Sequence, residues 1–443
     1  MDEKDEKGAD IITSGLSRLI RLGGLAGQVG ISMAGNAALN FFRSESRSAQ
    51  SHSEKLILNA YRIVETLGNL KGAPMKLGQM LSLYEGFLPP EITSILSLLQ
   101  NKAAPVPFET IEKFLRKEMG TAFDRIEFIE PDVYAAASIG QVHKIKLKNG
   151  PWAALKVQYP DIENVVEADM KSLRRILELI FSSFSSMDMD AVWKEVNSRL
   201  REELDYVQEA RNLKRMASMR GKNPGLIIPE VIDELSFSRV LCMSLEEGIS
   251  PSRAYSEEFP QEIRDQWGRV LFETLLEGIF GDGFLHADPN SANFAFLEDG
   301  RVIMYDLGCV KLVPSELQRG YARLVRAVLE DLTTDISDNL LTIGVCKKNG
   351  APPSENLIRD YMNVLKEPFR KTPPYRFGEG TNLQNDIMDL GRNHFTEILE
   401  LQFPPEAVFV DRTIVGHFGN LCKLRAQAPW RELLETKISS LAV

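Results

Sequence analysis

Three side chains in the second half of the chain have the types and spacing needed to hold and use a divalent cation. Asp288 and Asn293 are five positions apart, and Asp306 follows an apolar stretch further on. Carboxylate and amide oxygens are hard ligands, which Mg²⁺ prefers. A carboxylate next to such a site can also orient or deprotonate an attacking hydroxyl. The spacing therefore predicts phosphoryl transfer, with Asp306 and Asn293 as metal ligands and Asp288 as the catalytic carboxylate.

The residues around these positions match two motifs of phosphoryl-transfer enzymes. Residues 285–288 read Leu-His-Ala-Asp and, with Asn293, fit the H-x-D-x-x-x-x-N catalytic loop. Residues 306–308 read Asp-Leu-Gly, a variant of the D-F-G metal-binding motif. Ala287 stands where protein kinases have arginine, and no Ala-Pro-Glu motif follows Asp306. Both differences remove parts with which protein kinases order an activation segment and bind a peptide.

A lysine upstream of these motifs fits the same chemistry. Lys156 lies within Ala-Leu-Lys-Val, an apolar run that we expect to be a buried strand. A buried ammonium is costly unless it is paired. In a kinase-like site such a lysine contacts phosphates and a helix glutamate, so Lys156 is predicted to be catalytic and to contact the nucleotide. The alternative is an edge-strand lysine that points at solvent.

An acidic helix could supply the carboxylate that pairs with this lysine. Asp205 and Glu209 are one helical turn apart and are expected to share a face, whereas Glu203 points elsewhere. Asp205 or Glu209 could therefore be the catalytic carboxylate that pairs with the lysine. The alternative is a helix whose acidic face is merely solvated.

A run of small residues could bring backbone amides close to phosphate oxygens. Residues 135–143 read Ala-Ala-Ala-Ser-Ile-Gly-Gln-Val-His, in the place where a kinase has its glycine-rich loop. Alanine cannot adopt the full range of φ that glycine allows, and such runs are common in themselves. The predicted nucleotide-contacting residues are Ala135, Ala136, Ala137, Ser138, Ile139, Gly140, Gln141, Val142 and Lys156.

The elements that must position these residues follow an order typical of a two-lobed α+β fold. Asn149-Gly150 predicts a tight hairpin with positive φ at both positions. A β-rich portion then gives way to a mostly helical portion after Glu246. Periodicity predicts helices at 109–119, 161–184 and 190–219, strand character at 123–137, 142–148, 153–159, 226–229 and 238–245, and a loop-and-strand region at 281–312.

Composition excludes some classes of protein. Apolar residues make up 44% and charged residues 26% of 443, as in ordinary globular proteins. The formal charge of −10 and the lack of a Lys/Arg-rich run argue against nucleic acid as a main partner. The four cysteines have neither CxxC nor zinc spacing, so we expect buried thiols in a reducing compartment.

One uncharged stretch, Leu22 to Phe42, is long enough to span a bilayer as a helix. A polar stripe and a stripe of Gly and Ala recur along it every four residues, which favours close helix pairing. It is therefore predicted to contact a membrane or to form a homodimer. The alternative is a Gly-rich helix that lies against the protein's own surface.

The chain closely resembles the UbiB family of AarF-type atypical kinases from about Leu16 to Leu434. Residues 290–292 read Asn-Ser-Ala, where the common family loop has His-Pro-Gly, and this variant occurs in the ubiquinone-linked branch. The matching motifs are Lys76-Leu-Gly-Gln79 (the KxGQ signature), AAASIGQVH at 135–143, AALKVQYP at 153–160, Glu203-Leu-Asp205 with Glu209 and Asn212, FLHADPNSAN at 284–293, and YDLG at 305–308.

The resemblance implies a kinase-like fold whose N-terminal extension packs across the place where a peptide substrate would bind. It also implies that Lys76 pairs with Glu203 or Asp205, and that Lys156 pairs with Glu209. Lys76, Gln79, Glu203 and Asp205 are accordingly expected to be regulatory. The expected domains are an N-terminal segment (1–50), a helical KxGQ extension (51–107), a kinase-like N-lobe (108–245) and a kinase-like C-lobe (246–443).

The sequence therefore predicts an ATP- and Mg²⁺-dependent atypical kinase or ATPase that acts at a membrane surface. The resemblance implies a role in ubiquinone or other isoprenoid-lipid biosynthesis, with lipid or quinone-pathway components as partners. The expected location is peripheral to a membrane, on its cytoplasmic or organelle-matrix side. The alternatives are a protein kinase with a partner protein as acceptor and a pseudokinase scaffold that binds nucleotide without turnover.

Overall fold

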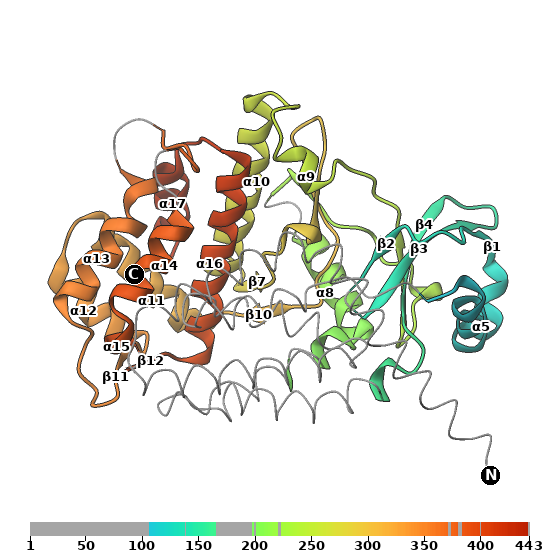
Figure 1. Ribbon diagram of the computed structural model, residues 1–443, viewed down its shortest axis with the longest axis horizontal. Helices are drawn as coiled ribbons and strands as arrows, with labels where there is room; N and C mark the ends of the chain where they lie inside the picture. Colours follow the sequence, from blue (N-terminus) through green and yellow to red (C-terminus); the bar gives the residue numbers. More distant parts are fainter. Residues whose placement is uncertain are drawn as a thin grey trace, which may run out of the picture. The chain divides into compact units, whose positions relative to one another are not determined.

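The computed structural model describes residues 106–137, 139–164, 197–198, 201–219, 223–370, 374–379, 383–398 and 400–441. Within these ranges a sheet-rich part is followed along the chain by a helix-rich part (Figure 1). The predicted two-lobed α+β fold is confirmed. Lys76, Gln79, Ser138 and the 22–42 segment lie outside the described residues.

An antiparallel sheet forms the centre of the first lobe. Its strand order is β1-β3-β4-β6, and β2 pairs with the outer end of β3. Because β4 lies between β3 and β6, Lys156 is not on an edge strand, and the solvent-facing alternative for this lysine is wrong. The strands are β1 Ile126–Ile129, β2 Ala135–Ala136, β3 Gly140–Leu147, β4 Trp152–Gln158 and β6 Val240–Ser244.

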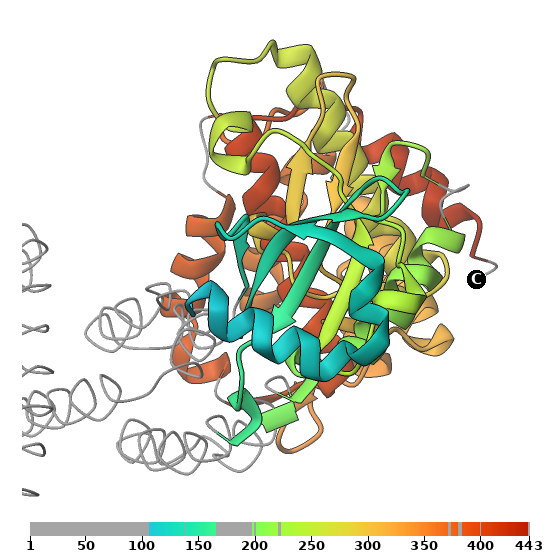
Figure 2. The ribbon, with the colours of Figure 1, turned by 90° about the vertical axis from the view of Figure 1, so that its right-hand side faces the viewer.

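The two faces of this sheet have different partners. Helix α5 (Phe108–Met119) lies across one face (Figure 2), and its Ile111 and Leu115 are completely buried there against Leu155. The alternation of side chains along β4 turns Lys156 to the opposite face. The lysine therefore faces the second lobe.

Helix α8 (Tyr206–Ser218) is shorter than the single helix predicted for 190–219. At Asp205 the backbone leaves the helical region (φ −98°, ψ 77°), and the Asp205 carboxylate accepts a hydrogen bond from the amide of Gln208 at 2.9 Å. Aspartate favours this N-cap position because its carboxylate satisfies a free helix N–H. Asp205 is thus the cap of the helix, and the prediction that it shares a helix face with Glu209 is wrong.

The hairpin between β3 and β4 forms as predicted, but its turn differs. Asn149 has a positive φ of 58°, whereas Gly150 does not have a positive φ. Three residues (148–150) lie between Leu147 and Pro151, whose N and O form a hydrogen bond of 3.3 Å, whereas the predicted primed turn has two. Residues 123–125 also differ from prediction, since they belong to the 3₁₀ helix Gly120–Arg125 rather than to a strand.

Short strands in the second lobe lead into the catalytic-loop motif and the Asp-Leu-Gly motif. β7 (Phe284–His286) pairs with β10 (Val310–Leu312), and β8 (Phe294–Phe296) forms a hairpin with β9 (Val302–Met304). β5 (Leu226–Ile227) pairs in parallel with β9, not with the first-lobe sheet. The ends of β7 and β9, the strands that precede Asp288 and Asp306, therefore lie close together.

Helices form the rest of the second lobe, around the long helix α10 (Gln261–Phe280). Phe272 of α10 packs on Trp430 with ring centroids 5.2 Å apart, and Phe377 packs on Trp430 at 5.3 Å. The remaining elements are α9 Pro251–Ala254, α11 Ser315–Leu329, α12 Thr333–Thr342, α13 Glu355–Leu365, α14 Leu383–Asn393, α15 Phe395–Ile398, α16 Pro405–Leu424, α17 Trp430–Ser439, β11 Cys346–Lys347, β12 Leu401–Gln402 and the 3₁₀ turns Gly120–Arg125, Asp233–Leu235, Ser291–Asn293 and Glu367–Phe369.

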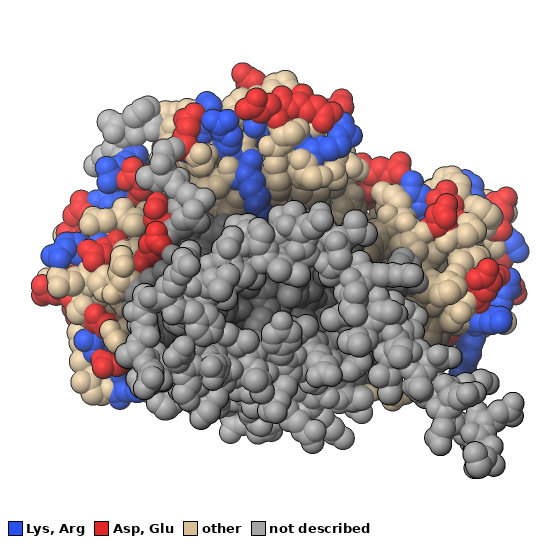
Figure 3. Space-filling model, viewed as in Figure 1, with Lys and Arg blue, Asp and Glu red and all other residues tan. Residues whose placement is uncertain are grey.

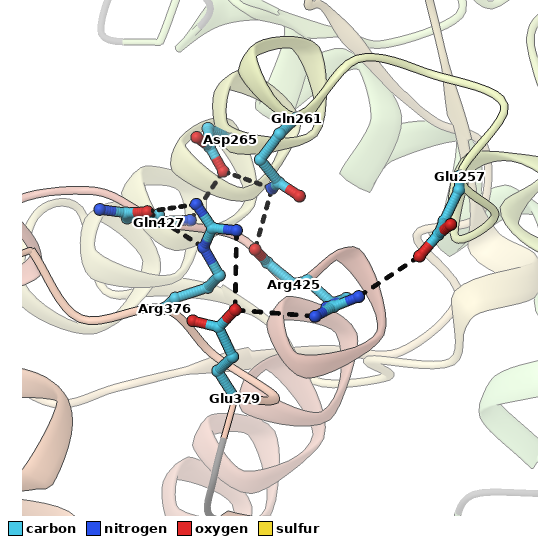
Figure 4. Close-up of polar contacts among 7 residues, drawn as sticks. All are labelled: Glu257, Gln261, Asp265, Arg376, Glu379, Arg425 and Gln427. Atoms are coloured by element: carbon cyan, nitrogen blue, oxygen red, sulfur yellow. Dashed lines mark hydrogen bonds and ion pairs between the residues drawn. The ribbon is translucent and has the colours of Figure 1, made fainter.

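A polar network joins the start of α10 to the end of α16 (Figure 4). The Gln261 side chain donates to the carbonyl of Arg425, a left-handed residue (φ 52°) that ends α16. Asp265 accepts from Gln261 and from the amide of Gln427, while Arg376 donates to the Gln427 side chain at 2.7 Å. These bonds fix α16 relative to α10, and α16 in turn supports the loop described below.

The surface of the described residues fits the acidic, globular composition. On the face in Figure 3, acidic and basic side chains are interspersed over the described atoms. Among the described helices, none has the length and hydropathy required to cross a bilayer. Neither observation bears on the predicted membrane contact of residues 22–42.

Candidate active site

Lys156 lies at the centre of the site and bridges two carboxylates. Its ammonium donates to both oxygens of Glu209 on α8, at 2.7 and 2.9 Å, and to Oδ2 of Asp306 at 2.8 Å. The Lys156 ammonium also lies 5.0 Å from the centre of the Tyr206 ring. The side chains of Lys156 and Glu209 are only 11% and 2% exposed, whereas Asp306 is 33% exposed. The site is thus buried at Glu209 and open at Asp306.

Charge and burial act in opposite directions on these groups. Burial by itself lowers the Lys156 pKa, but the charges of Asp306 and Glu209 outweigh it and hold the pKa well above its usual value. Burial and the charge of Asp306 raise the pKa of Glu209 to about 8, and the Lys156 ammonium opposes that rise. Because both Glu209 oxygens accept from the ammonium, we assign the proton to Lys156.

The small-residue run, residues 135–143, lies beside the strand that carries Lys156. Val142 lies directly opposite Lys156 in the β3–β4 pairing, so both side chains share the face that points to the second lobe. A tight connection joins β2 to β3, with Ala137 N donating to Gly140 O at 3.0 Å. A Cβ on Gly140 would lie 2.2 Å from the carbonyl oxygen of Val157. Glycine is therefore required at 140 by close backbone approach.

Two residues of this run, Gln141 and His143, lie on the face of the sheet opposite to Lys156. The Gln141 side chain is completely buried, accepts from Val106 N at 3.0 Å and lies 2.8 Å from Nε2 of His143. Nδ1 of His143 is 2.8 Å from the carbonyl of Glu130, and burial lowers the His143 pKa. We assign the neutral Nδ1–H tautomer, since the Gln141 amide then donates to Nε2. These side chains tie the loop strand to the start of α5.

Tyr206, the first residue of α8, is a site residue that sequence reasoning missed. Its hydroxyl is buried and has no hydrogen-bond partner among the described residues, and a Cβ on Gly140 would lie 3.1 Å from it. Burial raises its pKa. The signal was available, because Tyr206 precedes Glu209 by three positions and so shares its helix face.

The catalytic-loop motif folds back on itself and on the Asp-Leu-Gly turn. Nδ2 of Asn293 donates to the carbonyl of Asp288 at 3.1 Å, so its amide oxygen can face a metal. The amide of Ala287 donates to Cys309 O at 2.9 Å, and the amide of Tyr305 donates to Asn293 O at 2.9 Å. These backbone bonds place the catalytic loop next to the turn that contains Asp306.

Helix α16 holds the catalytic loop from behind. Nη2 of Arg412 donates to Ala287 O at 3.0 Å, and Nδ2 of Asn420 donates to Pro289 O at 2.8 Å. Both residues lie more than 120 positions further along the chain. Sequence reasoning missed them, and local spacing carried no signal that could have found them.

The donor set fits a hard cation. Oδ1 of Asp306 accepts from Gly308 N at 2.9 Å, and Oδ2 accepts from Lys156. With Asn293, this pair offers carboxylate and amide oxygens, as Mg²⁺ requires. No group of three His, Cys, Asp or Glu side chains in the described part of the chain could hold a metal by itself. A metal here would therefore depend on the Asn293 amide and on oxygens from a bound phosphate.

The structure brings only some of the predicted residues together. Lys156, Glu209 and Asp306 are in direct contact, and Asp288 contacts Asn293. Asp205 is used as a helix cap, and Glu203 is partly buried just before it. Lys76, Gln79 and Ser138 lie outside the described residues, so their predicted roles stay predictions. The bounds of the four domains also stay predictions.

Residues 98–339 match the ABC1 atypical kinase-like domain, which covers more than half of the chain. The chain therefore belongs to the ABC1 family of atypical kinases, to which the UbiB proteins predicted from the motifs also belong.

Individual proteins agree with this assignment. The chain is 28% identical over 428 residues to "Atypical kinase COQ8B, mitochondrial" of Danio rerio, covering 94% of this chain and 67% of that protein. It is 30% identical over 382 residues to "Atypical kinase COQ8, mitochondrial" of Saccharomyces cerevisiae, covering 83% and 74%. A solved structure of Rv3197 with erythromycin from Mycobacterium tuberculosis has a TM-score of 0.63 at 24% identity, covering 88% and 98%, and supports the fold alone.

Proposed function

We propose that this chain is an ATP- and Mg²⁺-dependent atypical kinase or ATPase that acts at a membrane surface in support of ubiquinone, or other isoprenoid-lipid, biosynthesis. The observation that supports it most directly is the Lys156 ammonium held between Glu209 and Asp306. A buried ion cluster is a weak way to stabilise a fold, because desolvation offsets most of the attraction. Such a cluster in a cleft therefore favours a catalytic role.

Each residue has a distinct task in this proposal. Lys156 binds nucleotide phosphates while Glu209 orients its ammonium. Asp306 and Asn293 hold Mg²⁺, which when bound neutralises charge on the transferred phosphoryl group. Asp288 accepts the proton of the attacking hydroxyl or water. The small side chains of 135–137 allow the loop to lie close to the phosphates.

Two other functions remain as alternatives to the main proposal. A protein kinase with a partner protein as acceptor would need a peptide-binding segment, and the sequence lacks both the HRD arginine and an Ala-Pro-Glu motif. A pseudokinase scaffold would not need Asp288, which the chain retains together with Asn293. An enzyme with a non-peptide acceptor accounts best for this combination.

The cellular setting is also proposed rather than observed. The two relatives named above carry "mitochondrial" in their names, which supports an organelle matrix side as the place of action. Residues 22–42 are proposed to contact the membrane or to form a homodimer. The proposed partners are ATP and components of the lipid pathway, with no nucleic acid.

Mg²⁺-dependent ATP turnover, with and without liposomes, tests the proposal. Asp306→Asn removes a charged metal ligand, so we expect ATP turnover to fall by at least about 100-fold. The matched control is Asp299→Asn, because Asp299 is an acid in the exposed turn between β8 and β9. We expect that control to keep full activity.

Three results would separate the candidate functions. Turnover stimulated by liposomes and lost in Asp306→Asn supports the main proposal. Binding of ATP without turnover by the unmodified protein supports the scaffold. If Asp306→Asn binds and turns over ATP like the unmodified protein, the assignment of this site is wrong.

A further inference from the structure

Tyr305, the residue just before Asp306, connects the site to the segment that joins the two lobes. Met304 is buried in the main core, and Tyr305 projects from the opposite face with Ile303. The Tyr305 hydroxyl donates to the backbone carbonyl of Glu246 at 2.9 Å. Glu246 lies in the segment that follows β6 and leads into the second lobe. A single side chain thus spans from the metal-binding turn to this joining segment.

The joining segment is the part of the site that a nucleoside bound at Lys156 through its phosphates would reach. β6 pairs with β4 so that Leu241 lies opposite Lys156 and Ser244 lies opposite Ala153. Three residues of an extended strand span about 10 Å, so β6 continues that distance past the position of Lys156, toward the joining segment. If the phosphates lie at Lys156 with the acceptor at Asp288, the base must extend the other way, toward the joining segment.

The carbonyl of Glu246 is therefore a natural acceptor for an amino group on the edge of a base. The segment cannot easily shift to offer another group, because it packs tightly on the second lobe. A Cβ on Gly248 would lie 2.9 Å from Cβ of Ala295 and 3.0 Å from Cδ1 of Ile303. The Tyr305 side chain, by contrast, is only partly buried.

Other side chains make contacts beside the joining segment. Lys144, on the cleft face of β3, bonds the Glu247 carboxylate at 2.5 Å and lies 4.5 Å from the centre of the Tyr134 ring. A base that binds here would compete with the Tyr305 hydroxyl, which already donates to the Glu246 carbonyl.

We infer that Tyr305 controls admission and choice of the nucleotide base: its ring lies on the path from Asp306 to Glu246, and its hydroxyl holds the carbonyl that an adenine amino group would use. This inference rests on the nucleotide-binding function proposed above. Base binding then exchanges the phenol bond for a bond from the base. The phosphate end of the site is unaffected by this exchange.

Calorimetric titration of the full chain with three magnesium-loaded probes tests the inference. The probes are ATP, GTP and inorganic tripolyphosphate, which has no base. Tyr305→Phe removes the bond to Glu246 and keeps the ring, so we expect ATP to bind about 3- to 10-fold more tightly. Tyr305→Leu also removes the ring and should tighten ATP binding at least as much. GTP has no amino group at the same place, so it should gain less. Tripolyphosphate affinity should not change in either variant.

The matched control is Tyr321→Phe, which removes a tyrosine hydroxyl bonded to Asp411 in the helical lobe. It should leave all three affinities unchanged. Unchanged or weaker ATP binding in both Tyr305 variants, or an equal change for tripolyphosphate, would overturn the inference. In that case ATP binding that is still lost in Asp306→Asn leaves the proposed function intact. If neither ATP nor tripolyphosphate binds any of these proteins, the proposed function fails and the inference fails with it.

Discussion

At the scale of single residues, the site depends on a buried cation with two acidic partners. Glu209 supplies two of the three hydrogen bonds to the Lys156 ammonium. If Glu209 loses its charge, Asp306 is the one charged partner left to the Lys156 ammonium among the described residues. Asp306 is also the more exposed of the two partners. Loss of Glu209 should therefore affect both the position of the lysine and the stability of the fold.

We expect Glu209→Gln to lower the free energy of unfolding by about 1–3 kcal/mol, since a buried charge loses a charged partner. ATP turnover should fall at least about tenfold because the ammonium is no longer oriented. Urea denaturation and a turnover assay measure the two effects. Glu112→Gln, at an exposed ion pair on α5, is the control and should change stability by less than about 0.5 kcal/mol. Equal effects of the two substitutions would contradict the role of Glu209.

A second residue-scale prediction concerns pH. His417 is buried beside Phe294, with ring centroids 6.0 Å apart, and burial together with the neighbouring His286 lowers its pKa to about 3. The unfolded chain binds a proton at this histidine below about pH 6.5, whereas the folded chain does not until about pH 3. Stability should therefore fall as the pH drops through this window, by up to about 1.4 kcal/mol per pH unit.

His417→Phe removes this titration and also the buried Nδ1 atom, which has no hydrogen-bond partner in the described part of the chain. We expect its unfolding free energy to depend less steeply on pH between about 6 and 4, measured by urea denaturation at several pH values. An unchanged slope in His417→Phe would mean that this histidine is not the source of the acid sensitivity.

At the scale of elements, α8 matters because its first turn carries Tyr206 and Glu209 into the site. The Asp205 cap fixes where this helix begins. We expect Asp205→Ala to cost about 1 kcal/mol of stability and to lower turnover, since fraying of the first turn displaces Glu209. Urea denaturation and hydrogen exchange of the α8 amides report these changes.

The matched variant Asp205→Asn separates capping from charge. Asparagine caps as well as aspartate, so it should preserve stability, exchange protection and turnover. If Asn behaves like Ala, the charge of Asp205 is what matters. That result would favour the regulatory pairing with Lys76 that the family resemblance implies.

At the scale of the whole molecule, α8 ties the first lobe to the second. Nδ2 of the buried Asn212 donates to the carbonyl of Leu307 at 2.8 Å, next to Asp306. Nε2 of Gln158 on β4 donates to the carbonyl of Leu204 at 2.7 Å, just before the helix. Together with the Lys156 bridge, these bonds set the relative position of the strand lysine and the metal-binding turn.

Asn212→Leu has a similar volume but leaves the Leu307 carbonyl without its donor. We expect a loss of about 1–3 kcal/mol in unfolding free energy and weaker Mg²⁺–ATP binding. Thermal denaturation with and without Mg²⁺–ATP measures both. Arg211 lies on the same helix and is exposed, so Arg211→Leu serves as the control and should cost less than about 0.5 kcal/mol. If the two variants lose equal amounts of ligand-induced stabilisation, Asn212 does not link the lobes.

The sequence by itself determined the α+β class and the family, and it supplied the candidates for the residues that carry the chemistry. Catalytic motifs have fixed spacing because each spans one turn or one strand end, as with Asp288 and Asn293 on one loop. The hydrophobic runs around Lys156 and Asp306 likewise marked buried strands, because alternation and burial are local properties of a chain.

Tertiary structure alone decided where α8 begins and what holds the catalytic loop in place. The pairing of Lys156 with Glu209, which the resemblance implied, is confirmed. Helical spacing also placed Asp205 on the face of Glu209, but the helix begins between these residues, so Asp205 is a cap and only Glu209 is a partner for the lysine. Arg412, Asn420 and the contact from Tyr305 to Glu246 join parts of the chain that are far apart in sequence. Their pairing depends on how the two lobes and α16 pack together, and no local periodicity encodes that arrangement.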